Sequence, residues 1–260
     1  MTIGSLLSGT SSSLLGSSSG SSTTSKASTS STASTAASTV SPFLAQAEQR
    51  IQSDAAVTTA QISKFGMLKS ALTSGQLAAK AMTTLTSATK PADVTTALGN
   101  FFNTFNASVS AANSAATATG SSSQSARATL LVRDLKTALS ADPASSAALK
   151  KLGLTIQTNG SLVQDAKKFA ASLASDPSGT LAAMAKIGSK VDSVSSKELA
   201  TGGTVGAALA TLNAKNTSLT AQQSALQALN QAMAASAAAS STSTQSSTGV
   251  AAYQSTMNGF

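Results

Sequence analysis

A ladder of apolar side chains that recurs every seven residues constrains this chain more than any other feature of its sequence. The ladder consists of Val205, Leu212, Leu219, Leu226 and Met233. Side chains at this spacing share one stripe of an α-helix, as the core positions of a coiled coil do. No charged residue follows Lys215, although a solvated coiled coil normally carries Lys and Glu on its outer positions. The stripe predicts a helical seam, and its uncharged flank favours a seam between subunits over one within the chain.

The composition argues against several classes of function. The 260 residues include no Cys, His or Trp, and only 10% of them are charged. The chain therefore lacks disulfides and thiolate sites, together with the commonest general base and the commonest metal ligand. The abundant serines do not by themselves indicate a nucleophile. We expect a protein that is not an enzyme and that has no catalytic residue, cofactor or metal site.

The net charge of +8 comes from basic residues that are dispersed along the chain. Nucleic-acid binding needs clustered basic residues, with aromatic side chains where single strands are bound. No apolar run reaches the roughly 18 residues of a membrane span, and the N-terminus lacks the pattern of a cleaved signal peptide. We expect no nucleic-acid partner, no membrane span and, if the protein is exported, a route without a cleaved signal peptide.

Composition also divides the chain into three parts. Residues 1–41 are rich in Ser and Thr and contain one charged side chain, which predicts a disordered export or assembly segment. The apolar clusters at residues 3–7 and 14–15 are candidate docking patches within it. Residues 42–239 predict a helical coiled-coil domain, and residues 240–260 a low-complexity C-terminal tail.

Breaks at Pro and Gly separate the helices that we expect in the helical domain. Ser41-Pro42 has the form of a helix start, and a long helix is expected from there to about residue 87. Shorter helices are expected over residues 92–118, 124–140 and 143–152, from residue 165 and from residue 177, and the last helix over residues 204–239. Asp142, Asp165 and Asp176 are interpreted as helix caps, and the Phe-rich segment 98–109 as core.

The only strong strand signal lies at residues 154–163. Asn159-Gly160 separates two short runs of strand formers, which predicts a hairpin with a two-residue type I′ loop. The expected fold is therefore mainly α. Long N- and C-terminal coiled-coil helices pack antiparallel, with short helices and this small β-hairpin between them.

Four local patterns follow one another along the chain in an informative order. They are residues 61–72 with the core Phe65-Gly66-Met67-Leu68-Lys69, the aromatic residues 101–106, the passage from Leu152-Gly153-Leu154 through Asn159-Gly160 to Asp176-Pro177, and the double glycine and long helix within residues 199–219. Together they resemble the bacterial flagellar filament-cap family, also called flagellar hook-associated protein 2. That family usually carries outer β-rich domains where this chain has only residues 87–97. The chain thus resembles a minimal or divergent member.

The resemblance implies a structural, extracellular component of the bacterial flagellum that oligomerises at the filament tip and assists flagellin assembly. It implies other copies of the chain, flagellin, hook–filament junction proteins and an export chaperone as partners. The candidate interface residues are Ile51, Ile62, Phe65, Leu68 and Leu72 on the first helix and the five ladder residues on the last. Two alternatives stay open: a monomeric secreted effector or translocator, and a flagellin-like subunit that forms an open-ended polymer.

Overall fold

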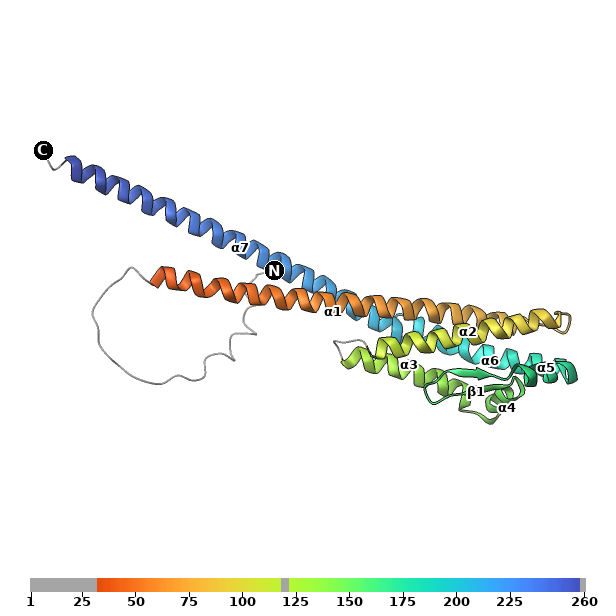
Figure 1. Cartoon of the computed structure of the whole chain (residues 1–260). Coiled ribbons are helices and arrows are strands. Elements are labelled where there is room, and N and C mark those ends of the chain that lie inside the picture. The colour runs from red at the N-terminus through yellow and green to blue at the C-terminus, as the bar shows by residue number, and fades with distance from the viewer. Residues whose placement is uncertain (1–31, 118–121, 258–260) are drawn as a thin grey trace, which may run out of the picture. The chain divides into compact units, whose positions relative to one another are not determined.

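The computed structural model of the chain describes residues 32–117 and 122–257, and nearly all of these residues are helical (Figure 1). Within them lie seven helices and one two-stranded hairpin. In chain order the elements are α1 (Thr32–Thr83), α2 (Pro91–Ala116), α3 (Ser122–Ser140), α4 (Pro143–Lys151), β1 (Leu154–Ile156), β2 (Leu162–Gln164), α5 (Ala166–Ser175), α6 (Pro177–Leu199) and α7 (Thr204–Met257). The chain divides into two compact units, Met1–Phe43 and Leu44–Phe260, and the packing described below lies within the second.

The predicted mainly α fold is confirmed. The first and last helices are the longest, with 52 residues in α1 and 54 in α7. From Leu44 onward, α1 runs in the direction opposite to α7 (Figure 1). Every helix and both strands contribute side chains to one apolar core. The bounds of α2, α3 and α4 agree with the predicted ranges to within two residues.

Helix α1 begins earlier than the sequence predicts. The start at Ser41-Pro42 is wrong, because α1 begins at Thr32 and contains Pro42 in its interior. An internal proline costs a helix about 3 kcal/mol, but three alanines in residues 32–41 favour the helical conformation. These residues, which the composition assigns to a disordered segment, are helical. Residues 1–31, with both candidate docking patches, lie outside the described part of the chain.

Helix α7 starts as predicted and ends later. The turn at Gly202-Gly203 precedes it, and the buried carboxylate of Glu198 accepts a hydrogen bond from the backbone N–H of Thr204 at 2.9 Å. The predicted end at residue 239 is wrong, because the helix continues through the low-complexity segment to Met257. No proline interrupts that segment, and a single glycine such as Gly249 costs a helix only about 1 kcal/mol relative to alanine.

The hairpin lies where the sequence predicts it, but its loop is one residue longer. The N–H of Gln157 donates to the Ser161 carbonyl at 2.8 Å, and the N–H of Gly160 donates to the Gln157 carbonyl at 3.0 Å. Residues 158–160 therefore form a three-residue loop, with Gly160 at a φ of 89°, and not the predicted two-residue type I′ loop. The Asn159 side chain stabilises the longer loop by accepting a hydrogen bond from the N–H of Ser161 at 3.0 Å.

The aromatic side chains of α2 form part of the core, as predicted. The rings of Phe101 and Phe105 are buried, with their centroids 5.8 Å apart. Two hydrogen bonds show that α2 lies antiparallel to α1. The hydroxyl of Ser108 donates to the carbonyl of Ala71 at 3.0 Å, and the ammonium of Lys64 donates to the hydroxyl of Ser114 at 2.6 Å. Since α2 ends at Ala116, it reaches along α1 only to about the level of Lys64.

Candidate assembly seam of the first and last helices

The five ladder residues of α7 are buried to different depths. Val205 and Leu212 belong to the apolar core. Leu219 is also buried, whereas Leu226 and Met233 are only half-buried. The ladder therefore begins as a seam within the chain and becomes more exposed toward its C-terminal end.

The candidate residues of α1 show the same division. Three of them are buried in the core that also holds Val205 and Leu212, namely Phe65, Leu68 and Leu72. Ile62 is partly buried against that core, and Ile51 is half-buried outside it. The structure thus brings the inner candidates of both helices into one core and leaves Ile51, Leu226 and Met233 with free apolar surface.

Two buried polar side chains on the same face of α1 were missed by sequence reasoning. Thr58 is 0% exposed and Gln61 is 2% exposed. Thr58 lies seven residues before Phe65, and Ile51 and Leu44 continue the same spacing toward the N-terminus. These positions form a second seven-residue ladder, on α1. The polar side chain of Thr58 interrupts its apolar pattern, so the ladder is not apparent from the apolar residues alone.

The exposed end of the α7 seam is uncharged. Residues 216–257 contain no Asp, Glu, Lys or Arg. Next to the half-buried ladder residues, Leu229 is 44% exposed. Exposed apolar side chains on an uncharged helical segment are typical of a surface that packs against another protein.

The three aspartates that precede helices act as N-caps, as predicted. Asp142, Asp165 and Asp176 each accept a hydrogen bond from a backbone N–H in the first turn of α4, α5 and α6. The donors are Ser145 at 2.6 Å, Lys168 at 3.0 Å and Gly179 at 2.9 Å. These carboxylates therefore have a structural role that satisfies otherwise unpaired helix N–H groups.

Two of these caps, Asp142 and Asp176, also form ion pairs with lysines. Hydrogen bonds from Ser145, with a further contribution from Lys190, lower the pKa of Asp142 to about 2. The ammonium of Lys151, which forms an ion pair with Asp176, is the main cause that lowers the pKa of Asp176 to about 2. Both carboxylates are held in their charged form, which suits a cap and does not suit a general acid or base near neutral pH.

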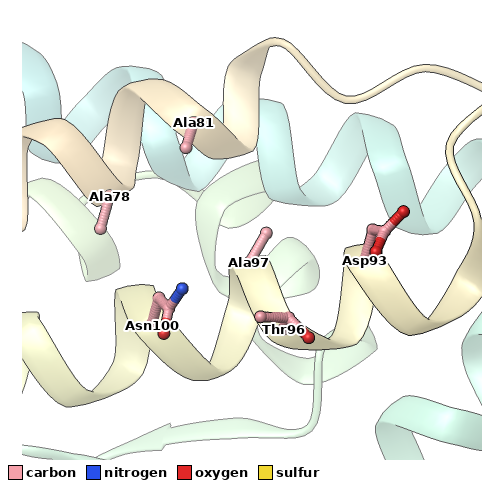
Figure 2. A pocket seen from close by; sticks show the side chains of 6 residues that line it. All are labelled: Ala78, Ala81, Asp93, Thr96, Ala97 and Asn100. Carbon is pink, nitrogen blue, oxygen red and sulfur yellow. The ribbon is translucent and has the colours of Figure 1, made fainter.

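Two hollows lie along the boundary between α1 and α2. Figure 2 shows the larger one, of about 330 Å³, and its lining side chains are Ala78, Ala81, Asp93, Thr96, Ala97 and Asn100. The other has a volume of about 310 Å³, and Lys64 and Met67 line it together with small side chains of α2. Small and mostly uncharged side chains of this kind do not assemble the nucleophile, base and oxyanion donors of an active site.

Across residues 32–117 and 122–257, no three acidic, His or Cys side chains are grouped so that they could hold a metal ion. None of the helices in this part combines the length and apolar character that a membrane crossing requires.

These features define a mainly helical protein whose long first and last helices carry a partly exposed seam, with no charged residue in its α7 end after Lys215. Residues 70–249 match the family model described as flagellar hook-associated protein 2 C-terminus. This match spans more than half of the 260 residues, and the chain therefore belongs to the flagellar hook-associated protein 2 family. The comparisons with curated proteins and with solved structures gave no match. The resemblance to the filament-cap family that the sequence indicates is confirmed.

Proposed function

We propose that this chain oligomerises at the tip of the bacterial flagellar filament and assists the assembly of flagellin there. The observation that carries this proposal is the exposed end of the α7 seam, where Leu226 and Met233 are half-buried in the uncharged segment 216–257 of that helix. The family match supports the flagellar context. The proposed partners are other copies of the chain, flagellin, hook–filament junction proteins and an export chaperone, at an extracellular location.

In this proposal, the inner and outer parts of the seam have different tasks. The inner residues, such as Phe65 and Leu212, fix α1 and α7 within the core of one chain. The outer residues Ile51, Leu226 and Met233 bury their remaining apolar surface against a neighbouring copy, which is worth about 25 cal/mol per Å² buried. The assistance to flagellin is then steric and conformational, and we propose no enzymatic step.

The mass of the purified protein in solution, measured by light scattering, tests this proposal. We expect a closed oligomer of several copies for the unchanged chain. Met233→Asp places a charge in the proposed interface, and we expect it to reduce the mass to that of a monomer. Leu77→Asp is the matched control, because Leu77 is an apolar residue of α1 that is 64% exposed and lies off the seam.

The outcomes separate the alternatives. A monomeric unchanged chain would contradict the proposal and favour a secreted effector. An open-ended polymer would favour a flagellin-like subunit. Equal loss of mass in Met233→Asp and Leu77→Asp would show that the effect is not specific to the seam. Far-UV circular dichroism of each variant verifies that the helices remain folded.

A further inference from the structure

The buried polar residues Thr58 and Gln61 lie on the part of α1 that extends beyond the end of α2. The hydrogen bond from Lys64 to Ser114 marks the level at which α2 ends, and Thr58 lies six residues further toward the N-terminus of α1. The ladder of α7 continues past the apolar core, and its member Leu219 is buried with 6% exposure. We infer that Thr58 and Gln61 pack against α7 near Leu219.

The hydroxyl of Thr58 makes this level of the seam weak. Its oxygen is buried and has no hydrogen-bond partner within the part of the chain that the structure describes, and an unsatisfied buried polar group lowers stability. The companion positions of the α7 ladder, Asn216 and Gln223, are polar and half-buried. In coiled coils, polar residues at core positions fix the register but reduce the stability.

Apolar contacts lie on both sides of this level. Toward the core, Phe65 and Leu68 are fully buried. On the outer side, Leu44 is 8% exposed and Ile51 is half-buried, so the seam continues there as a thinner apolar stripe. Within residues 42–117 and 123–237, every ion pair joins residues that lie between Lys80 and Glu198 in the sequence. None of these ion pairs involves the residues of α1 before Thr58 or the residues of α7 after Leu219.

We propose that Thr58 and Gln61 form a polar layer at which the outer part of the α1–α7 seam opens while the core remains folded. The outer part comprises residues 44–57 of α1 and residues 220–237 of α7. Its opening is a local, sub-global unfolding event that frees Ile51, Leu226 and Met233 for contact with another copy. The opening itself does not depend on oligomerisation, so it can be tested whether or not the proposed function holds.

Amide hydrogen exchange of the full chain tests the proposal, at a concentration where light scattering reports monomers. Thr58→Val keeps the shape of the side chain and removes its unpaired hydroxyl. We expect exchange in both outer segments to slow by about tenfold, which corresponds to about 1.4 kcal/mol. Ser195→Ala is the matched control, because the hydroxyl of Ser195 on α6 is also buried and has no hydrogen-bond partner among the described residues. It removes the same kind of group inside the core, so we expect no change in the outer segments.

A second substitution keeps the test independent of general effects on stability. Thr58→Ser retains the hydroxyl and loses only a methyl group, so the outer segments should exchange at least as fast as in the unchanged chain. The proposal is overturned if Thr58→Val slows the core and the outer segments equally, because the seam would then open only with the whole domain. It is also overturned if Thr58→Val and Ser195→Ala slow the outer segments to the same extent.

Discussion

At the scale of single residues, the helix caps Asp142 and Asp176 contribute to how the stability of the protein depends on acid. The pKa values of Asp142 and Asp176 are lowered to about 2 by hydrogen bonds and neighbouring lysines. In the unfolded chain an aspartate has a pKa of about 3.9. Between about pH 2 and pH 4 the unfolded chain therefore binds more protons than the folded chain. The stability that these carboxylates contribute is complete above this window and is lost as the pH falls through it.

Asp176→Asn tests this acid response. Asparagine caps a helix about as well as aspartate, but it removes the titrating charge and the ion pair with Lys151. We expect the urea midpoint of the unchanged chain to fall more steeply between pH 5 and pH 2 than the midpoint of the variant. Above pH 5 the variant should be the less stable of the two. Parallel pH profiles would show that the lowered pKa of Asp176 contributes nothing to folding.

Asn106 links α2 to the hairpin through two hydrogen bonds. Its amide nitrogen donates to the Leu162 carbonyl at 3.0 Å, and its amide oxygen accepts from the Leu162 N–H at 2.7 Å. Asn106→Ala removes the partner of the Leu162 N–H and of the Leu162 carbonyl. We therefore expect a loss of about 2 kcal/mol in the free energy of unfolding. Asn103→Ala, at an exposed position of the same helix, is the control in urea denaturation. Equal losses in both variants would contradict a role for the hydrogen bonds.

At the scale of secondary structure elements, the sequence predicts the breaks well and some ends poorly. Asp142 and Asp176 combine a capping side chain with a following proline, and both signals act locally on the helix start. The early start of α1, before Pro42, depends on a balance between the helix propensity of residues 32–41 and the hydrogen bond that Pro42 removes. A local start signal such as Ser41-Pro42 does not predict the outcome of this balance. The hairpin loop depends on the side-chain oxygen of Asn159, and a two-residue turn rule omits it.

Alanine substitutions at two glycines within helices are expected to change the stability in opposite directions. A β-carbon on Gly188 of α6 would collide with the carbonyl oxygen of Ala79 of α1 and lie 3.3 Å from the β-carbon of Met82. Gly188→Ala must therefore separate two packed helices, and we expect a loss of about 2 kcal/mol in the free energy of unfolding. Gly66→Ala meets no atom within 4 Å, and we expect a gain of about 1 kcal/mol. Thermal and urea unfolding check both signs, and a loss in Gly66→Ala would contradict the open surroundings of Gly66.

At the scale of the whole molecule, the seam explains why the candidate site was only partly predictable. The spacing of Val205, Leu212 and Leu226 identified the stripe, but spacing carries no information on what covers it. Whether a residue lies inside the core depends on how far α2 extends along α1, and this is set by tertiary packing. The role of the outer residues Ile51, Leu226 and Met233 as an interface between copies remains a prediction.

A pair of cysteines distinguishes a seam within the chain from a seam between chains. Burial decreases from Phe65 to Ile51 on α1 and from Leu212 to Leu226 on α7, so two antiparallel ladders would bring Ile51 and Leu226 together. The chain contains no cysteine, and a disulfide requires Cα atoms about 4.4–6.8 Å apart. We expect Ile51→Cys combined with Leu226→Cys to form an intrachain disulfide in dilute, oxidising solution, as seen by faster migration on a non-reducing gel. Leu77→Cys combined with Leu226→Cys should not do so, because Leu77 lies off the seam.

The same locked variant then tests whether assembly needs the outer seam to open. With the disulfide intact, Ile51→Cys/Leu226→Cys should remain monomeric at concentrations where the unchanged chain oligomerises, because its outer apolar side chains stay within one chain. Reduction should restore the oligomer, and light scattering before and after reduction measures both masses. Disulfide-linked dimers as the only oxidised product would instead place Ile51 and Leu226 across a subunit boundary. An oligomer that forms equally well with the intrachain disulfide intact would show that copies associate through a different surface.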